Sequence, residues 1–426
     1  MKNKRFISMI LAITLILGIV PTNVFATQGD TYSIDNVYSE YEKDADTDDY
    51  EEELGGETDE NSNENAELSS YRQQSAFSVF MQEKMVEYKS LKEAQSTEDE
   101  NSTEEANPPQ ATLSVMPIAG NEAEITGGST YTTLEAAVTD ATSGDTIKLL
   151  ADVELELALS ISEEITLDLN GFDIKQTEEY SVISITSSGN LTLEDNGSRA
   201  DRYGYWDTSS GDYAIVANEA DVPTDTDYTE LQGGVIYGGI GTQSGSYKYG
   251  GGVYVTGGTF TMDGGNIAGN TARSGGGVYV ENSGTFTMDG GTIAGNTATT
   301  NGMGVYISSS TFTMERGTIS GNKTIGTSSS YGGGVYVYSS STFTMNDGTI
   351  SDNKTSYGGG VFISTSSTFA MKKGSIENNT ASYGGVYVSS SSTFTMEDGI
   401  ISYNTARSGG GVYVSDGTFI MEGGTG

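Results

Sequence analysis

The chain repeats one glycine-rich pattern seven times between residues 250 and 426. Each copy contains GGGVYV, a short polar stretch, TFTM, DGGTI and GNTA with small variations, and successive copies begin 25 to 30 residues apart. Their first valines are Val253, Val278, Val305, Val335, Val361, Val386 and Val412. A repeat of this length is the signature of a solenoid, a propeller or an array, so it constrains the fold more than any local pattern does.

Each copy predicts three short strands. Apolar and polar residues alternate over residues 253–255 and 260–262, and residues 266–268 form a third run with one inward isoleucine. Alternation with a period of two indicates strands with one buried face. The Gly-Gly, Asp-Gly and Gly-Asn pairs between the runs suit tight turns. Three strands and three turns match one coil of a right-handed parallel β-helix, and the glycine content argues against a helical solenoid.

Stacked coils should align equivalent residues in columns about 4.8 Å apart. One inner column is Phe260, Phe286, Phe312, Phe343, Phe369, Phe394 and Phe419. A second is Met262, Met288, Met314, Met345, Met371, Met396 and Met421. A lone coil buries too few apolar side chains to offset the entropy of ordering its residues, so the stability of each coil must come from its neighbours.

A polar column lies three residues after the isoleucine of the third run. It consists of Asn270, Asn296, Asn322, Asn353, Asn379 and Asn404. Asparagine tolerates left-handed backbone angles, and its amide group both donates and accepts hydrogen bonds. We therefore expect an inward-facing structural ladder and not a ligand site.

An outward aromatic column is the candidate binding stripe. It consists of Tyr254, Tyr279, Tyr306, Tyr336, Phe362, Tyr387 and Tyr413. Exposed rings at the strand spacing can stack on sugars or contact another protein. The alternative is that tyrosine, which has a high β propensity, only stacks on itself along a strand face.

A second outward array is a Thr-x-Thr pattern on the TFTM runs. It consists of Thr259 and Thr261, Thr285 and Thr287, Thr311 and Thr313, Thr342 and Thr344, and Thr393 and Thr395. The array resembles the flat surface of insect-type antifreeze proteins, which makes ice binding a further alternative. Ala370 and Ile420 interrupt it, and threonine is also an ordinary residue of exposed strands.

Residues 1–26 have the features of a secretory signal peptide. Basic residues precede an apolar run, and small residues lie before an expected cleavage after Ala26. No later run is long enough for a transmembrane helix. The chain contains no cysteine and no histidine, so we expect no disulfide and no thiol or imidazole site.

Residues 27–107 contain 24 acidic and 5 basic residues. Such a segment cannot bury enough apolar surface to offset chain entropy, which predicts a disordered acidic spacer. Apolar residues at helical spacing suggest a short helix near 75–93. The net charge of −39 argues against nucleic-acid partners, because phosphate contacts need Lys and Arg.

Residues 108–249 are expected to form an N-terminal cap and irregular coils before the seven regular repeats of residues 250–426, the last of them incomplete. Thr132 and Glu135 have capping-box spacing, and Gly144 is expected to close the helix that follows. Residues 197–249 are expected to be an insertion or an irregular coil, with the GGVIYGG segment as a degenerate first repeat.

A helix, a GDTI strand, ITLDLNG and glycine-rich coils, in that order, resemble the pectin-lyase-like right-handed β-helix group. More narrowly, IAGNTARSGGGVYV resembles the repeats of polymorphic outer membrane proteins and adhesin-like proteins. Isoleucine takes the place of phenylalanine in their FxxN motif, as in Ile293-x-x-Asn296. The likeness covers about 300 residues, from the cap to the end of the repeats. It implies the fold and leaves the function open, because adhesins and enzymes share these coils.

No repeat departs from the others in a way that indicates catalysis. A glycosidase needs two carboxylates at a set separation, and a lyase needs metal ligands beside a basic residue. The charged residues of the repeats are scattered over one turn, so we name no catalytic, cofactor-binding or metal-binding residue. A polysaccharide-active enzyme with its site in residues 197–249 or beyond the last repeat remains the alternative function.

The sequence therefore predicts a secreted or cell-surface, all-β protein of bacterial type whose solenoid binds carbohydrate or surface proteins. We expect no cofactor and a monomeric full-length chain. The seventh copy ends after Met421-Glu422-Gly423-Gly424 without a capping element. This predicts further chain, possible attachment to a cell through it, and an edge open to association in its absence.

Overall fold

A computed structural model gives the structure of the protein and describes residues 120–207, 213–224, 226–244, 247–326 and 329–425. The expected signal peptide, the acidic spacer and the short helix near 75–93 lie outside these residues. No helix of the described part is long and apolar enough to cross a membrane.

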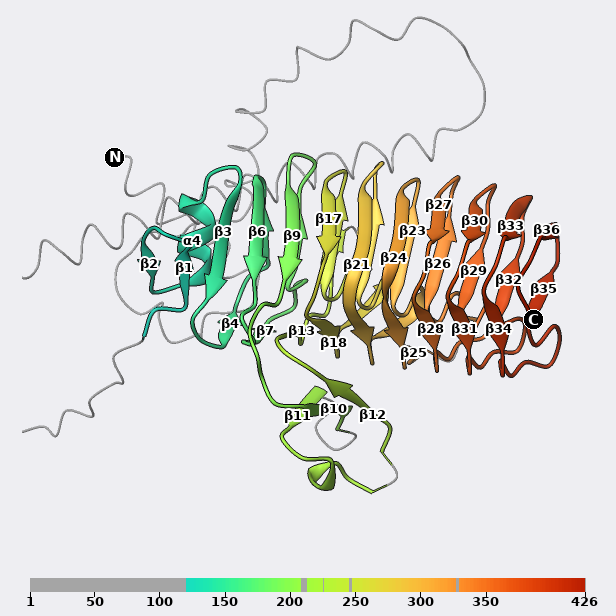
Figure 1. Ribbon diagram of the computed structural model, residues 1–426, viewed down its shortest axis with the longest axis horizontal. Helices are drawn as coiled ribbons and strands as arrows, with labels where there is room; N and C mark the ends of the chain where they lie inside the picture. The colour runs from blue at the N-terminus through green and yellow to red at the C-terminus, as the bar shows by residue number, and fades with distance from the viewer. Residues whose placement is uncertain (1–119, 208–212, 225, 245–246, 327–328, 426) are drawn as a thin grey trace, which may run out of the picture. The chain divides into compact units, whose positions relative to one another are not determined.

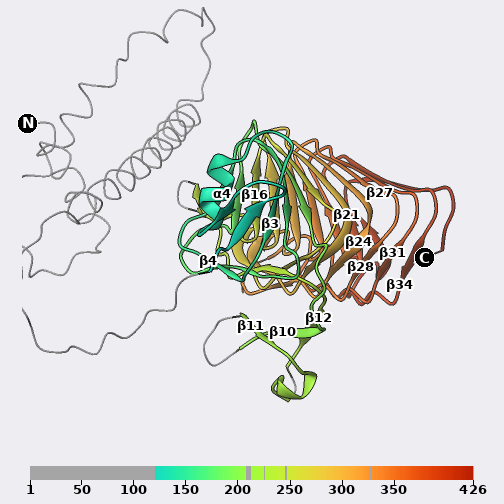
Figure 2. The same ribbon diagram turned by 60° about the vertical axis from the view of Figure 1, so that its left-hand side comes forward.

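The described chain is a parallel β-helix in which each coil crosses three faces (Figures 1 and 2). Face 1 consists of β3 (Asp145–Leu149), β6 (Glu164–Asp168), β9 (Asn190–Glu194), β17 (Thr259–Met262), β21 (Thr285–Ala294), β24 (Thr311–Ser320), β27 (Thr342–Met345), β30 (Thr368–Met371), β33 (Ser392–Met396) and β36 (Gly417–Met421). These are the TFTM runs and their counterparts in earlier coils. The long strands β21 and β24 continue from face 1 into face 2.

Face 2 contains the isoleucine runs. Besides the second halves of β21 and β24, it consists of β4 (Val153–Leu155), β7 (Ile174–Gln176), β13 (Val235–Tyr237), β18 (Asn266–Ala268), β28 (Thr349–Ser351), β31 (Ser375–Glu377) and β34 (Ile400–Ser402). Face 3 contains the VYV runs. It consists of β5 (Leu159–Ile161), β8 (Ile183–Ile185), β16 (Val253–Thr256), β20 (Val278–Glu281), β23 (Val305–Ser308), β26 (Val335–Tyr338), β29 (Val361–Ile363), β32 (Val386–Val388) and β35 (Val412–Val414).

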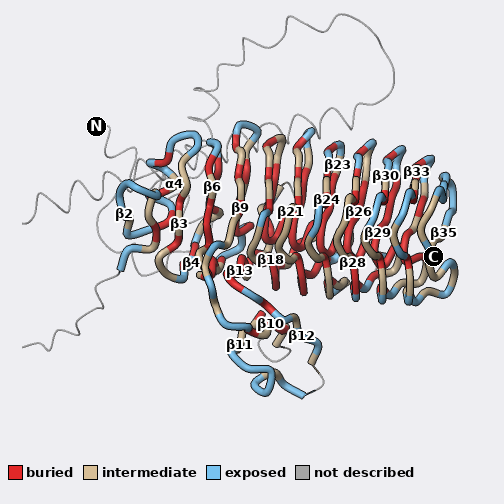
Figure 3. Tube along the Cα trace, viewed as in Figure 1, coloured by how far each residue is buried: buried red, intermediate tan, exposed pale blue. Residues whose placement is uncertain are grey.

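Neighbouring strands of the three faces pair in parallel and align equivalent residues of successive repeats. On face 1 Phe286 pairs with Phe312, and on face 3 Val278 pairs with Val305. The phenylalanine rings stack at centroid distances of 4.6 to 5.0 Å. Buried segments recur in successive coils (Figure 3), and the methionine column is buried until Met421, which is 51% exposed. The inner columns expected from the repeat are confirmed.

A fourth, shorter face lies at the GNTA runs, where the sequence pattern predicts only a turn. Three parallel strands lie there, namely β19 (Thr271–Ser274), β22 (Thr297–Asn301) and β25 (Lys323–Thr324). An antiparallel hairpin of β14 (Thr242–Ser244) and β15 (Tyr247–Tyr249) precedes them. The three parallel strands contain no large apolar residue whose alternation would be visible in the sequence, and pairing between coils defines them.

The N-terminal end of the solenoid is covered by a small cap. It consists of β1 (Ala123–Ile125), β2 (Thr130–Tyr131) and α4 (Leu134–Asp140), and β1 pairs antiparallel with β3. Leu134 and Ala137 of α4 are fully buried in the same hydrophobic core as the coils. The predicted capping helix is therefore present.

The ends of α4 differ from those expected. Thr133, and not Thr132, is the N-cap, and its hydroxyl accepts a hydrogen bond from the Ala136 N–H at 3.3 Å. The helix stops at its C-cap Ala141, before Gly144, because the chain there already turns extended. Gly144 has a positive φ of 90° in the turn that leads into β3.

Residues 197–234 form an insertion between face 1 and face 2 of one coil, here called the lobe. It consists of β10 (Arg202–Trp206), β11 (Tyr213–Val216), the 3-10 turn η3 (Glu219–Asp221) and β12 (Tyr228–Leu231). The strands form an antiparallel sheet with β10 in the centre, and it projects from the side of the solenoid (Figure 1).

The GGVIYGG segment after the lobe is not a degenerate VYV strand. Its strand β13 lies on face 2, where Ile236 pairs with Ile174 of the previous coil and Ile267 of the next. The expectation was wrong because VIY and VYV have the same alternation, and only the pairing partners distinguish face 2 from face 3.

Candidate functional site

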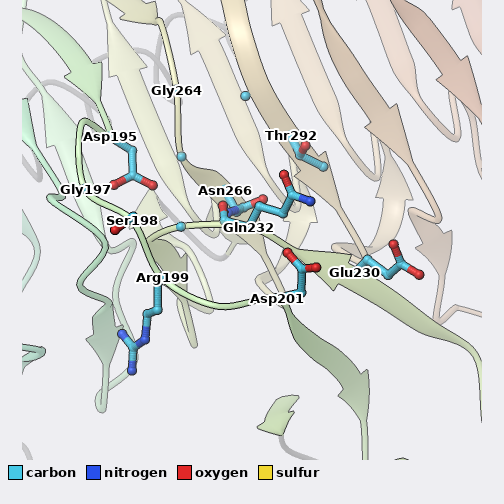
Figure 4. Close-up of a pocket in the computed structure, with 13 residues that line it drawn as sticks. Asp195, Gly197, Ser198, Arg199, Asp201, Glu230, Gln232, Gly264, Asn266 and Thr292 are labelled. Atoms are coloured by element: carbon cyan, nitrogen blue, oxygen red, sulfur yellow. The ribbon is translucent and has the colours of Figure 1, made fainter. Parts of the chain in front are cut away.

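A polar cleft of about 600 Å³ lies where the lobe meets face 2 (Figure 4). Asp201, Glu230 and Gln232 belong to the lobe, whereas Asn266 and Thr292 belong to strands of the solenoid. The remaining lining residues are Asp195, Gly197, Ser198, Arg199, Gly233, Gly264, Gly265 and Gly291. The cleft exists because the lobe leaves the solenoid between two faces and lies against the one that follows.

A buried ion-pair network holds the base of the lobe. Arg202 donates two hydrogen bonds to the carboxylate of Asp173, at 2.6 and 2.8 Å, and a third to the Gly233 carbonyl at the far end of the lobe. Asp173 also accepts the N–H of Val235 at 3.0 Å. Both Arg202 and Asp173 are less than 9% exposed, so loss of Asp173 would leave the charge of Arg202 buried without its ion-pair partner.

Arg199 adds a second ion pair at the same place. Its guanidinium donates to the Asp152 carboxylate at 2.7 Å and to the Gly171 carbonyl at 3.1 Å. Burial opposes ionisation of Asp152, but the hydrogen bonds from Arg199 and from the Asp173 N–H outweigh it and lower the pKa of this carboxyl. The guanidinium of Arg199 is therefore already paired with Asp152 and the Gly171 carbonyl, although Arg199 lines the cleft.

The lobe packs on glycines of the solenoid. The Trp206 indole N–H donates to the Gly295 carbonyl at 2.7 Å, and the Tyr213 ring lies on Gly269 so closely that any Cβ atom there would overlap with it. Gly269 and Gly295 have positive φ values of 64° and 62°. The approach of Tyr213 leaves no room for a side chain at Gly269, and the positive φ there is one that glycine adopts without strain.

The remaining charges of the cleft are acidic. The Asp195 carboxylate is occupied, since it accepts the N–H groups of Gly171 at 2.6 Å and Gly234 at 2.7 Å. Asp201 and Glu230 are exposed to solvent at the cleft wall. With Arg199 paired elsewhere, the cleft offers carboxylates, amides and hydroxyls to a ligand, a set that repels polyanions.

A second hollow of about 360 Å³ adjoins the cleft and shares Glu230 and Thr292 with it. Tyr228, Thr229 and Glu230 of the lobe and Thr292, Thr318, Ser320, Gly321 and Asp352 of the solenoid line it. Tyr228 is 40% exposed and presents an aromatic ring at its edge. The two hollows together follow the same face across several coils.

One column of face 2 changes from glycine to residues with side chains beyond the lobe. From β18 onward, the residue that follows each face 2 strand has a positive φ, and it is Gly269, Gly295, Gly321, Asp352, Asn378 and Tyr403 in successive coils. Tyr403 has a φ of 54° and is 82% exposed. A bulky residue in the left-handed region is a backbone outlier, so Tyr403 is held as an exposed ring at a conformational cost.

The predicted tyrosine stripe is not an exposed surface. Tyr254, Tyr279, Tyr306, Tyr336 and Phe362 are only 5 to 9% exposed. Further rings pack against them, namely Tyr249, Tyr331, Tyr338, Tyr357 and Tyr387. The expectation of open, flat rings was wrong because the segments before several of the VYV strands lie beside the column and add Tyr249, Tyr331 and Tyr357 to it.

Burial also changes the chemistry of these phenols. Desolvation, followed by the charge of Glu281, raises the pKa of Tyr254 and Tyr279 far above the usual value. Desolvation likewise raises the pKa of Tyr306 and Tyr336. These hydroxyls are therefore protonated at any physiological pH, and they are not available to a ligand.

The asparagine column forms a continuous ladder. From Asn270 to Asn404, each side-chain N–H donates to the amide oxygen of the asparagine in the next coil, at 2.9 to 3.0 Å. The same oxygen also accepts the backbone N–H of the preceding asparagine, as Asn322 does for Asn296 at 2.9 Å. Five members of the column are at most 1% exposed, so the ladder lies inside the solenoid.

The threonine array extends further than the repeats. Strand pairing aligns Thr261 with Thr192, Thr192 with Thr166 and Thr166 with Thr146. One column therefore contains threonine in seven successive coils, up to the Ala370 interruption. Ice binding by this array stays a prediction, and absence of thermal hysteresis in a purified sample would contradict it.

Two departures from the repeat mark this side of the solenoid in the sequence. The repeat is interrupted at residues 197–234, and Asp201 and Glu230 lie within that interruption, but no residue there was named. Tyr403 also stands where other copies have glycine, aspartate or asparagine. Within the described residues, no group of three or more carboxylates could hold a metal ion.

The geometry defines a β-solenoid with a lateral lobe, and the comparisons specify its type. Residues 238–423 match the model of a family described as a right handed beta helix region. Searches of curated proteins and of solved structures found no match to the chain. The chain therefore contains a right-handed β-helix, and the fold class expected from the repeat is confirmed. This agrees with the pectin-lyase-like resemblance and leaves the adhesin-like likeness without further support.

The family match does not decide between a binding protein and an enzyme, because β-helices of this kind serve both. It also begins after the lobe, so it carries no information on Asp201 or Glu230. What the protein does has to be argued from the cleft and the face beside it.

Proposed function

We propose that the protein is an extracellular binding scaffold that holds a neutral polysaccharide along face 2. The ligand begins in the cleft beside the lobe and continues over the hydroxyl-bearing residues of the following coils. Tyr403 carries this proposal, because its ring is 82% exposed and its backbone is held at a positive φ. Exposed aromatic rings with a polar surround are suited to stacking on the apolar faces of sugars.

The spacing supports one extended ligand. Tyr403 occupies the same column position as Gly321, which lines the second hollow, and lies three coils further along. Three coils correspond to about 14 Å along the axis. Tyr228 at the hollow and Tyr403 beyond it thus provide two ring contacts, with Thr318, Thr349 and neighbouring hydroxyls between them.

The charge of the site favours a neutral ligand. Asp201 and Glu230 are exposed in the cleft, and Asp352 is exposed in the second hollow. Acidic polysaccharides would meet uncompensated like charge there. This distinguishes the proposal from binding of galacturonans or sulfated glycans.

A retention assay on immobilised polysaccharides tests the proposal. We expect binding to neutral polysaccharides and none to polygalacturonate, and Tyr403→Ala should weaken binding about threefold to tenfold. Tyr180→Ala is the matched control, since Tyr180 is a 40% exposed tyrosine that lines neither hollow. Equal losses in the two variants, or retention only on polyanions, would contradict the proposal.

The second candidate is a polysaccharide-active enzyme, which the two exposed carboxylates of the cleft favour. Glycoside hydrolysis uses one carboxyl group as an acid and another as a nucleophile or base. Release of reducing ends that is lost in Glu230→Gln and in Asp201→Asn would establish this function and would replace the binding-only proposal. Retention of polysaccharide without product supports the scaffold.

Secretion is part of the proposal and rests on the signal-like residues 1–26. Expression in a bacterial host should give an exported chain whose mass lacks these residues. A chain that stays in the cytoplasm with its N-terminus intact would contradict it.

A further inference from the structure

The aromatic residues beside face 3 form a continuous path of rings. The Tyr254 and Tyr279 rings are 5.7 Å apart, and Tyr279 and Tyr306 stack at 4.7 Å with an interplanar angle of 11°. Tyr306 meets Tyr336 edge to face at 5.1 Å. These tyrosines are 7 to 9% exposed, so the path runs through a desolvated layer.

The main column of rings runs from Tyr254 to Tyr413, and only one of its residues cannot form a phenoxyl radical. Tyrosines from outside this column lie around that residue. Phe362 follows Tyr336, but Tyr331 lies 6.2 Å from Tyr336 and 5.0 Å from Tyr357. Tyr357 in turn lies 5.8 Å from Tyr387. A path of tyrosine rings thus bypasses the phenylalanine.

The path has an accessible end beside the short fourth face. Tyr247 is 42% exposed and its ring lies 6.5 Å from that of Tyr249. Tyr249 is 4.9 Å from Tyr279 in the main column. At the other end, Tyr387 is 4.9 Å from the half-buried Tyr413.

A proton acceptor is placed at the buried part of the path. The Tyr254 hydroxyl donates to one oxygen of Glu281 at 2.5 Å, and the Tyr279 hydroxyl donates to the other at 3.4 Å. Burial raises the pKa of both phenols, so neither is ionised before oxidation. Removal of an electron from a phenol makes its proton strongly acidic, and Glu281 is positioned to take it.

We propose that this tyrosine path conducts one-electron oxidation along the solenoid, from Tyr247 to Tyr413. A one-electron oxidant removes an electron from Tyr247, giving a phenoxyl radical and a proton released to solvent. Each phenoxyl radical is then reduced to a phenol by an electron and a proton from the next tyrosine, which becomes the phenoxyl radical, and the oxidising equivalent moves inward. At Tyr254 and Tyr279 the carboxylate of Glu281 holds the proton during this transfer.

A tethered photo-oxidant tests the path. Because the chain has no cysteine, Glu179→Cys gives a single attachment site for a ruthenium polypyridyl complex. Glu179 pairs with Lys248 at 2.6 Å, and Lys248 is the neighbour of Tyr247 in β15. A flash in the presence of a sacrificial electron acceptor produces the Ru(III) oxidant, and a spin trap with peptide mapping records which tyrosines become radicals.

We expect trap adducts at Tyr413, which lies six coils, or roughly 29 Å, beyond Tyr254. Tyr403 is the internal control, because it is 82% exposed and has no ring contact among the described residues. Conduction predicts at least tenfold more adduct at Tyr413 than at Tyr403. A freely diffusing oxidant would label Tyr403 more, and this would overturn the proposal.

Conservative variants break the path without changing its packing. Tyr306→Phe with Tyr336→Phe should lower the Tyr413 adduct at least tenfold, since Phe362 shows that phenylalanine fits this column. Phe362→Tyr should keep or raise the yield. An unchanged Tyr413 yield in the double variant would show that the rings only pack. The assay needs no polysaccharide, so its outcome is independent of the proposed binding function.

Discussion

The terminal methyl of Met314 lies against Gly348 of the next coil, where a Cβ atom on residue 348 would come within 2.6 Å of it. The same contact recurs between Met262 and Gly291, Met288 and Gly317, Met345 and Gly374, Met371 and Gly399, and Met396 and Gly424. This explains why a glycine of the turn after TFTM is retained while its neighbours change to Glu, Arg or Lys. The glycine accommodates both a positive φ and the methionine of the coil before.

Gly348→Ala should therefore destabilise the solenoid. Its φ of 106° is unfavourable for any other residue, and the new methyl would also press on Met314. We expect a loss of about 2 kcal/mol in the free energy of unfolding, measured by denaturant titration. Gly127→Ala is the control, because Gly127 has a φ of 77° but no atom within 4 Å of its Cβ position. If the two changes cost the same, the methionine contact contributes nothing.

The inner columns were predictable because periodicity alone determines which residues face inward. Phe286 and Asn296 recur at equivalent places, and parallel stacking then leaves no freedom in their partners. Periodicity does not determine whether a residue that faces outward is covered by another part of the chain. Tyr336 points away from the core, but the turn at Gly332 passes so close that a Cβ there would lie 2.7 Å from the Tyr336 Cβ. Alternation cannot show that a neighbouring turn covers an outward face.

The cleft was unpredictable for a related reason. It is formed by an insertion whose position depends on long-range contacts, such as that between Arg202 and Asp173, and not on any repeat. An interruption of the pattern shows where an insertion begins. It does not show which face of the solenoid the insertion covers.

Replacing an asparagine of the ladder should lower the free energy of unfolding most in the interior of the ladder. Asn322→Ala removes the acceptor of the Asn296 backbone N–H and of one Asn296 side-chain N–H, and it removes the side-chain donor to the Ile293 carbonyl, all in a site closed to water. Unsatisfied buried groups cost about 1–3 kcal/mol each, so we expect a loss of roughly 3 kcal/mol. At the half-buried Asn404, water can replace the amide, and Asn404→Ala should cost about 1 kcal/mol. Thermal unfolding of both variants measures the difference, and equal losses would argue against the role of burial.

The buried tyrosines make the protein sensitive to alkali. Burial raises the folded-state pKa of Tyr254, Tyr279, Tyr306 and Tyr336 above the unfolded value of about 10. Their stabilisation is complete below pH 10 and is lost as the pH rises above it, by up to about 1.4 kcal/mol per pH unit for each phenol. Absorbance of phenolate should therefore show an early phase from exposed tyrosines and a late phase that coincides with loss of β circular dichroism. A single phase near pH 10 with the fold intact would contradict the burial.

The glycines under the lobe allow its docking to be separated from the stability of the coils. Gly269→Asn should release the lobe, because the new side chain collides with the Tyr213 ring, whereas asparagine itself tolerates the left-handed backbone, as Asn378 does in the same column. Gly321→Asn is the matched control, since the nearest atom to its Cβ position is 3.8 Å away.

Trp206 is the only tryptophan of the chain and reports on this docking directly. Its indole N–H donates to the Gly295 carbonyl, so release of the lobe should shift the emission to longer wavelength and expose residues 199–233 to proteolysis. We expect both changes in Gly269→Asn and neither in Gly321→Asn, with the β circular dichroism of the coils unchanged in both. Because the lobe forms one wall of the cleft, Gly269→Asn should also weaken polysaccharide binding, whereas Gly321→Asn, at the edge of the second hollow, should weaken it less. Normal emission in Gly269→Asn would mean that Tyr213 does not hold the lobe in place.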